Sequence, residues 1–174
     1  MSELSTQSMP TRSVRLNRLS KTVMVASLGV FGLLVALNNI TDYGSNYAFV
    51  RHVLSMDTTF PGNSLRWRAI SVPLLWHIFY VLIIGAEFAT GALFSFAAWK
   101  MAKAINMASP AFKAAHTLVP VATAVGFLIW FFGFSVVGGE WFAMWQSHSW
   151  NGQEAAFRFF MSMLGVCIFT QQKE

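Results

Sequence analysis

Long uncharged stretches, separated by short polar segments, dominate the pattern along this chain. The first runs from Thr22 to Thr41, and the third runs from Ala114 to Gly139. The second runs from Ala69 to Trp99 and is interrupted only by Glu87. At about 1.5 Å per residue, each is long enough to cross roughly 30 Å of hydrocarbon as an α-helix. The pattern therefore predicts an all-α integral membrane bundle.

The expected spans follow from where these stretches begin and end. A basic, polar segment of residues 1–21 precedes a first span at about 22–41. The second stretch is longer than the hydrocarbon needs, and Pro73 suits a first helical turn, so the second span is expected at about 73–97. A third is expected at about 114–137.

A fourth span is expected at about 152–170, followed by a short tail of residues 171–174. Asn151, with Glu154 three residues on, resembles the start of a helix. Glu154 can pair with Arg158 one helical turn later. Because this stretch contains both charges, a re-entrant or surface-lying final helix stays open as an alternative.

Composition supports the membrane assignment and excludes some functions. Hydrophobic residues make up 55% of the chain and charged residues only 11%, whereas soluble domains carry about a quarter charged residues. The basic residues lie at the ends of apolar stretches and not within a polar domain, so nucleic-acid binding is not expected. Cys167 is the single cysteine and permits no internal disulfide.

Lysine and arginine set the expected orientation. With four spans, residues 1–21 carry four of them, the 100–113 loop three and the tail one, which makes eight on one side. The other side carries four, namely Arg51, Arg66, Arg68 and Arg158. Positively charged loops stay in the cytoplasm, so both termini are expected there.

The two longest loops then share the outer side. In the first, Phe49, Val50, Val53 and Leu54 form an apolar stripe typical of a short amphipathic helix at the membrane surface. In the second, residues 139–148, the side chains of Trp141, Phe142 and Trp145 are expected on one face. We expect the loops to pack on each other as an outer cap, with Asp57 and Glu140 paired to arginines.

Candidate binding residues gather in these loops and at the start of the fourth span. They are Arg51, His52, Asp57, Glu140, Trp141, Trp145, His148, Glu154 and Arg158. The histidines and carboxylates are chemically suitable metal ligands, but no metal-binding spacing and no cysteine pair occurs. No metal and no cofactor are therefore predicted.

Two polar residues lie within the predicted spans. Glu87 is about 21 Å along the helix from Pro73, where an ionised carboxylate is costly. It either joins helices by hydrogen bonds or lies on a proton or ligand pathway. His77 lies near the outer boundary, and a haem there would need His52 or His148 as its second axial ligand. Small residues at Gly85/Ala89 and Ala122/Gly126 have the spacing that allows helices to approach closely.

The loop motifs resemble a known family. They are Phe49-Val50-Arg51-His52-Val53-Leu54-Ser55-Met56-Asp57-Thr58-Thr59-Phe60, Gly138-Gly139-Glu140-Trp141-Phe142-Ala143-Met144-Trp145-Gln146-Ser147, Trp150-Asn151-Gly152-Gln153 and Ala156-Phe157-Arg158-Phe159. They are similar to those of the bacterial "predicted small integral membrane protein" family, a domain-of-unknown-function family. The resemblance covers almost the whole chain after residue 20. It implies a bacterial inner-membrane protein of this size and brings no activity, cofactor or catalytic residue.

The leading functional hypothesis is a non-catalytic accessory or scaffold subunit, because no catalytic constellation is visible. Its expected partners are the lipid bilayer and other membrane-protein subunits or further copies of itself. One alternative is a redox or quinone-associated subunit that uses His77 and the outer histidines. Another is a unit for proton or small-solute permeation centred on Glu87.

Overall fold

A computed structural model describes residues 10–173, and its long elements are all helices. In chain order they are α1 (Arg12–Thr41), α2 (Tyr43–Ser55), η1 (Arg66–Arg68), α3 (Pro73–Ala104), α4 (Ser109–Ala115), α5 (Leu118–Phe127), η2 (Leu128–Trp141), η3 (Met144–Gln146) and α6 (Gln153–Gln171). No strand occurs within residues 10–173. Residues 1–9 of the predicted N-terminal segment and Glu174 of the tail lie outside the described residues. The predicted all-α class is confirmed.

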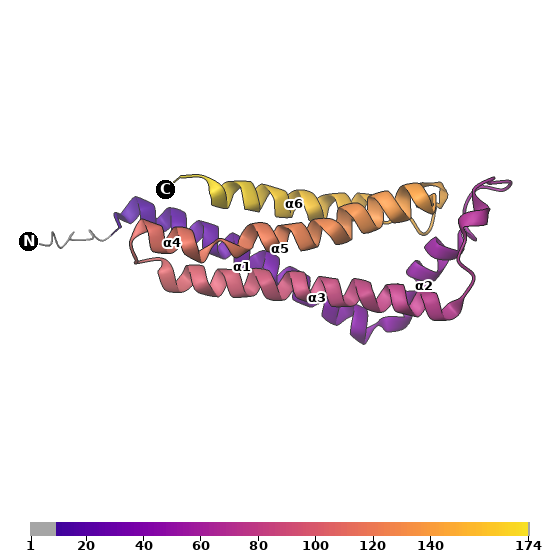
Figure 1. Cartoon of the computed structure of the whole chain (residues 1–174), viewed down its shortest axis with the longest axis horizontal. Coiled ribbons are helices and arrows are strands. Elements are labelled where there is room, and N and C mark those ends of the chain that lie inside the picture. The colour runs from indigo at the N-terminus through magenta and orange to yellow at the C-terminus, as the bar shows by residue number, and fades with distance from the viewer. Residues whose placement is uncertain (1–9, 174) are drawn as a thin grey trace, which may run out of the picture.

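The long helices run side by side along one axis (Figure 1). Both ends of the described chain and the turn between α3 and α4 lie at one end of the bundle, here called the terminal end. At the opposite end, the loop end, lie α2 and the segment of residues 56–72, here called the strap. Residues 142–152, which connect η2 to α6, also lie at the loop end.

Three stretches are long and apolar enough to cross a membrane. They are Arg12–Thr41, Pro73–Ala104 and the continuous path Ser109–Trp141, with 30, 32 and 33 residues. At about 1.5 Å per residue each exceeds the roughly 30 Å of a hydrocarbon core. These lengths and compositions are those of an integral membrane protein. The 19 residues of α6 are not among the three, so the fourth span stays a prediction.

The first helix begins ten residues before the predicted span, because Thr11 caps it and accepts a hydrogen bond from the Val14 N–H at 3.4 Å. Two basic residues of its first turns are buried, Arg18 with 0% and Lys21 with 1% of the surface exposed. Both are therefore packed within the protein and not in contact with solvent. Their side chains bind backbone carbonyls at the C-terminal ends of α3 and α6.

Arg18 binds the turn between α3 and α4. Its guanidinium donates to the carbonyls of Ile105 and Met107 at 3.0 and 2.6 Å and to the Ser109 hydroxyl at 3.0 Å. It also lies 4.8 Å from the ring centroid of Phe112. The carbonyls that end a helix have no partner within the helix, so a buried cation stabilises this turn.

Lys21 makes a similar contact at the C-terminal end of α6, where its ammonium donates to the Gln172 carbonyl at 2.6 Å. This bond fixes the end of α6 to the first turns of α1. The terminal end is therefore held together by two cations from one helix.

The pair α1 and α3 makes the most extensive contact between elements. A Cβ atom built at Gly32 would lie 2.8 Å from the Gly91 Cα, and one at Gly91 would lie 2.5 Å from the Leu33 backbone nitrogen. One turn away, a Cβ at Gly29 would lie 2.8 Å from the Ser95 nitrogen. The two backbones therefore touch directly, as small residues permit in membrane helices.

The small residues singled out in the sequence divide into one pair that packs and one that does not. Ala122 and Gly126 are buried, and a Cβ at Gly126 would lie 2.5 Å from the Met163 sulfur of α6. Gly85, in contrast, is exposed and has nothing within 4 Å of a built Cβ. The close helix contact expected at Gly85 is therefore not formed within residues 10–173.

The third apolar stretch is not one regular helix. It is interrupted at His116 and Thr117, between α4 and α5, and Pro120 lies in the first turn of α5, where its missing N–H is not needed. From Leu128 onward, in η2, the backbone is π-helical, a form that is rare and usually short. The last i→i+5 bond joins the Phe142 N–H to the Val137 carbonyl at 3.0 Å.

The contact between α1 and α3 gives a stability prediction. Gly91→Ala should lower the free energy of unfolding by about 1–3 kcal/mol, because its Cβ has no room against α1. Gly85→Ala, the same change on the same helix, should be neutral or stabilising because its Cβ meets nothing. Unfolding in mixed micelles of mild detergent and dodecyl sulfate measures both. Equal effects would contradict the assigned helix contact.

Candidate functional site

A polar group joins α1 to α3 inside the bundle. The Asn39 amide of α1 donates to the Glu87 carboxylate oxygen Oε2 at 2.6 Å, and the Tyr80 hydroxyl donates to the Asn39 carbonyl at 2.9 Å. Glu87 and Tyr80 are each 2% exposed. We call Asn39, Tyr80 and Glu87 the polar node. It gives the buried carboxylate a donor on the facing helix, as a polar group inside a membrane protein requires.

The position of the node follows from the glycine contact. Glu87 precedes Gly91 by one helical turn, and Tyr80 lies two turns before Glu87, so all three share one face of α3. Asn39 lies two turns beyond Gly32 on the antiparallel α1. The node is therefore the continuation of the α1–α3 contact toward the loop end.

A group of aromatic rings extends this contact between the helices from the buried node to the protein surface. The Tyr43 hydroxyl and His77 Nδ1 are 2.8 Å apart, and the Tyr47 ring stacks on His77 with centroids 4.2 Å apart. Tyr43 also meets Tyr80 edge to face at 4.7 Å between centroids. His77 itself is exposed. The two intramembrane candidates, His77 and Glu87, are thus connected through tyrosines that sequence reasoning did not single out.

A signal for these tyrosines was present in the sequence. Asn39, Tyr43 and Tyr47 follow each other at four-residue intervals. Tyr43 and Tyr47 share one face of α2, whereas the helix break at Asp42 leaves Asn39 on α1. The same spacing argument groups His77 with Tyr80 on α3. Only the pairing of the two faces could not be read from either stretch alone.

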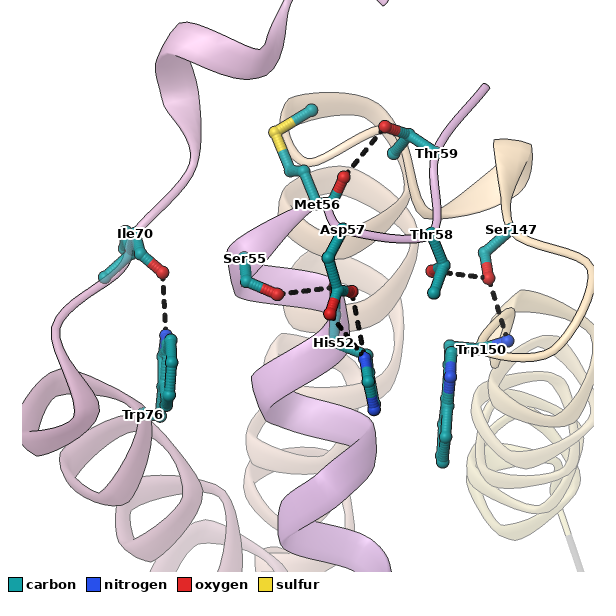
Figure 2. Close-up of polar contacts among 10 residues, drawn as sticks. All are labelled: His52, Ser55, Met56, Asp57, Thr58, Thr59, Ile70, Trp76, Ser147 and Trp150. Atoms are coloured by element: carbon teal, nitrogen blue, oxygen red, sulfur yellow. Dashed lines mark hydrogen bonds and ion pairs between the residues drawn. The ribbon is translucent and has the colours of Figure 1, made fainter. Parts of the chain in front are cut away.

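A second polar cluster lies at the loop end, where α2 meets the strap (Figure 2). His52 Nδ1 is 2.9 Å from both carboxylate oxygens of Asp57, and the Trp150 ring stacks on the imidazole with centroids 4.6 Å apart. The Ser147 Oγ accepts two hydrogen bonds, from the Thr58 hydroxyl at 2.9 Å and from the Trp150 backbone N–H at 3.0 Å. These contacts bind the end of α2 to residues 147–150.

Further contacts join the strap to residues 141–146. The Phe60 N–H donates to the Gln146 side-chain oxygen at 3.1 Å, and the Phe60 and Trp145 rings meet edge to face at 5.8 Å. Arg68 donates to the Trp141 carbonyl at 3.2 Å. The two long loops therefore contact each other, as expected, whereas their position on the outer side of a membrane stays a prediction.

Two details of the expected loop packing were wrong. Phe142 is 5% exposed while Trp141 and Trp145 are 48% and 51% exposed, so these three residues do not share a face. The helix ends at Trp141, and Ala143 has a left-handed backbone (φ 52°), so residues 141–145 do not form one continuous helix. The expected pairing of loop carboxylates with arginines is replaced, since Asp57 binds His52 and Arg68 binds a carbonyl.

The remaining predicted site residues lie on the surface of the loop end. Glu154 and Arg158 form an exposed pair at 3.8 Å, as the four-residue spacing indicated. The other residues are also exposed, namely Arg51, Glu140 and His148. Asn151 accepts from the Gln153 N–H at 3.1 Å instead of capping three residues on, because Gly152 is the capping residue of α6.

The histidines belong to different clusters. His77 contacts Tyr43 and Tyr47, His52 contacts Asp57 and Trp150, and the His148 ring lies 6.5 Å from that of Phe60. Within residues 10–173, no three His, Cys, Asp or Glu side chains are grouped so that they could hold a metal ion.

An apolar pocket of about 420 Å³ lies among α2, α3, α5 and η2. Three walls form it, from α2, from α3 and from α5 with η2. The α2 wall contributes Phe49, Val50, Val53 and Leu54, and the α3 wall Phe79, Leu82, Ile83 and Ala86. The third wall and its end are lined by Val125, Leu128, Ile129, Phe132, Gly133, Phe134, Val137, Gly138, Phe142 and Met144.

The pocket opens toward the side of the bundle. Leu82, Leu128 and Phe132 line it and are 62%, 61% and 51% exposed. They lie within stretches that are long and apolar enough to cross a membrane, so the opening lies along the apolar length of the helices and not at either end. No residue predicted as a site lines this pocket, because an apolar lining has the same sequence pattern as a lipid-facing surface.

The comparisons with known proteins agree with the membrane architecture. The family model described as "Predicted small integral membrane protein (DUF2165)" matches residues 17–173. The chain belongs to this family. No curated protein and no solved structure matches it. The matched range contains the polar node, the loop-end cluster and the pocket of this small integral membrane protein.

The polar node gives a prediction for this family member. Glu87→Gln should change the free energy of unfolding little, because an amide oxygen still accepts from Asn39. Glu87→Leu should lower it by about 1–3 kcal/mol, because the Asn39 amide then loses its buried acceptor. Unfolding in mixed micelles measures both, and Glu154→Leu at the exposed loop end is the control.

Two outcomes would contradict a role for Glu87 as a hydrogen-bond acceptor alone. One is equal destabilisation by Gln and Leu, which would mean that the carboxyl group itself is needed for folding. The other is a Gln variant that folds and accumulates normally but reproduces the phenotype of a deletion. That result would assign a titrating role to Glu87.

Proposed function

We propose that this protein is a non-catalytic accessory subunit that holds the hydrocarbon chain of a membrane lipid in the pocket between α2, α3 and η2. The observation that carries the proposal is the pocket itself, which has apolar walls and a side opening at the depth of the lipid chains. Pockets of about 300–1,000 Å³ are typical of small-molecule and cofactor sites.

The α2 wall of the pocket is held in place, which supports a specific binding site and not an accidental gap in the packing. The apolar stripe of α2 faces the pocket, and α2 is fixed at its end by the His52–Asp57 contact and the Trp150 stack. The η2 wall is π-helical, a geometry often found at functional sites. A lipid chain would therefore meet a preformed surface that the loop end holds in place.

The accessory role is supported by the surface of the loop end. Trp67, Trp141 and Trp145 are 72%, 48% and 51% exposed there, with Arg66 exposed beside them. Tryptophan and arginine are frequent in binding surfaces. A chain bound under α2 and a partner subunit, or a second copy, bound at the loop end would contact the same structural unit.

The two alternatives receive less support from the geometry. For a quinone-associated subunit, the pocket would suit an isoprenoid tail, but its lining is apolar, and His77 is engaged with Tyr43 and Tyr47. For proton permeation, Glu87 is connected toward the loop end through Tyr80 and Tyr43. Toward the terminal end the Gly32–Gly91 backbone contact closes the α1–α3 interface, which supports a structural role.

We further propose a bacterial inner membrane, four spans and an outer loop end. The packing of α6 against α5 and η2 supports a fourth span, as does the Lys21–Gln172 bond, which places its end beside the first turns of α1. The excess of Lys and Arg in the segments at the terminal end supports cytoplasmic termini.

The proposed topology predicts the behaviour of fusions. A reporter that is active only outside the cytoplasm should stay silent after Lys173 and be active when inserted at Asn63 of the strap. Activity of the Lys173 fusion would remove either the fourth span or the orientation. The Asn63 insertion serves as the positive control, because the strap lies at the opposite end of the bundle.

The pocket predicts how lipid labelling responds to filling it. A Cβ at Gly133 meets only the Leu128 carbonyl, at 3.6 Å, so Gly133→Leu can fold and extend into the pocket that Gly133 lines. It should reduce labelling of residues 79–86 by a phospholipid with a photoreactive group in its chain. The expected reduction is roughly tenfold, the ratio that about 1.4 kcal/mol of lost packing gives.

Gly85→Leu is the matched control, because it adds the same side chain to an exposed position of α3 that does not line the pocket. Labelled peptides are identified by mass spectrometry after reconstitution into lipid nanodiscs. Equal labelling of residues 79–86 in the wild type and in Gly133→Leu would show that no chain occupies the pocket.

A further inference from the structure

Selectivity at a lipid-chain site needs a contact outside the pocket. Within the bilayer an apolar wall offers a chain little that neighbouring lipids do not, because lipid tails are as apolar as the wall. Packing alone therefore separates one chain from another poorly. The group that selects a lipid must contact its head, at the loop end of the pocket.

Arg68 stands at that end. It belongs to η1 of the strap, five residues before α3 begins, and its guanidinium donates to the carbonyl of Trp141, the last residue of η2. It therefore bridges the ends of the two helices that flank the opening of the pocket. The adjoining residues connect it to the wall, since Phe142 follows Trp141 and lines the pocket, and the Ile70 N–H donates to the carbonyl of Leu54, another lining residue, at 2.8 Å.

The depth of Arg68 matches that of a lipid headgroup. The rings of Trp141 and Trp67 lie 4.6 and 5.3 Å from its guanidinium carbon, and both tryptophans are exposed. Exposed tryptophans gather where hydrocarbon meets headgroups. The α3 wall of the pocket runs from Phe79 to Ala86, about 9–20 Å along the helix from Pro73, which is the hydrocarbon side of that boundary.

Most N–H donors of the Arg68 guanidinium make no hydrogen bond within residues 10–173. Of its five N–H donors, one binds the Trp141 carbonyl. Its Nε is buried and has no hydrogen-bond acceptor within residues 10–173, so a phosphate would be bound by the terminal nitrogens of the guanidinium. Glu140 is next to Trp141 in the chain, but no ion pair joins it to Arg68 within the same residues. Arg66, in the same turn, adds a second, exposed cation.

We propose that the lipid bound in the pocket is a glycerophospholipid of net negative charge, whose phosphate binds Arg68 between Trp67 and Trp141. This inference rests on the proposed function, the binding of a lipid chain. Guanidinium groups suit phosphate because their N–H donors match its oxygens in pairs. A zwitterionic lipid has the phosphate too, but it brings a cation of its own toward Arg66 and Arg68.

The test compares two photoreactive lipids with the same labelled chain, a phosphatidylglycerol and a phosphatidylcholine, in nanodiscs of the full-length protein. In the wild type, phosphatidylglycerol should label residues 79–86 about threefold more strongly, a ratio in the range of an exposed ion pair. Arg68→Gln should bring the ratio close to one. Arg158→Gln, which removes an exposed arginine on α6, should leave it unchanged.

A measurement on the wild type covers the case in which Arg68→Gln does not fold. Raising the salt concentration from 0.1 to 1 M shortens the screening length from about 10 to about 3 Å, so the ratio should fall toward one. A ratio of one at low salt, a ratio that salt leaves unchanged, or a preference retained in folded Arg68→Gln would each overturn the proposed headgroup site.

These failures differ from a failure of the proposed function. If Gly133→Leu reduces labelling by both lipids while Arg68→Gln keeps the preference, the pocket holds a chain and the headgroup assignment is wrong. If Gly133→Leu leaves labelling by both lipids unchanged, the chain does not occupy the pocket and both proposals fail.

Discussion

The direct backbone contact between α1 and α3 at Gly32 and Gly91 is the constraint on which the rest of the bundle depends. Lipid tails give two apolar helices no hydrophobic reason to associate, so close packing and interhelical hydrogen bonds must hold them together. Once the glycines set the register, Asn39 faces Glu87 toward the loop end. Toward the terminal end, the same register brings Arg18 to the carbonyls that follow α3.

The pocket exists because the third stretch does not follow α3 as closely as α1 does. The α5 helix packs along α3, while the π-helical η2 has much less contact with it. The space that opens between η2 and α3 is covered by α2, whose apolar stripe is buried against protein. The α2 helix, which the sequence pattern places at the membrane surface, thus forms one wall of the pocket.

Sequence reasoning located the helices because hydropathy and length decide them, and it located the start of α3 because Pro73 fits a first turn. It could not tell Gly85 from Gly91, because four-residue spacing of small residues does not reveal which face meets another helix. It could not show that Arg18 and Lys21 are buried, since burial of a cation depends on carbonyls far away in the chain. The pocket was missed because its walls come from three segments.

The polar node and the pocket lie on two different faces of α3. Successive residues of an α-helix are rotated by about 100°, so the hydrogen bonds that turn Tyr80 and Glu87 toward α1 also decide where their neighbours point. Those neighbours are Phe79 and Ala86, which line the pocket. A buried carboxylate in this helix can therefore shape the pocket without any chemistry of its own. By fixing the rotation of α3 against α1, it fixes which side chains line the proposed lipid site on the other side.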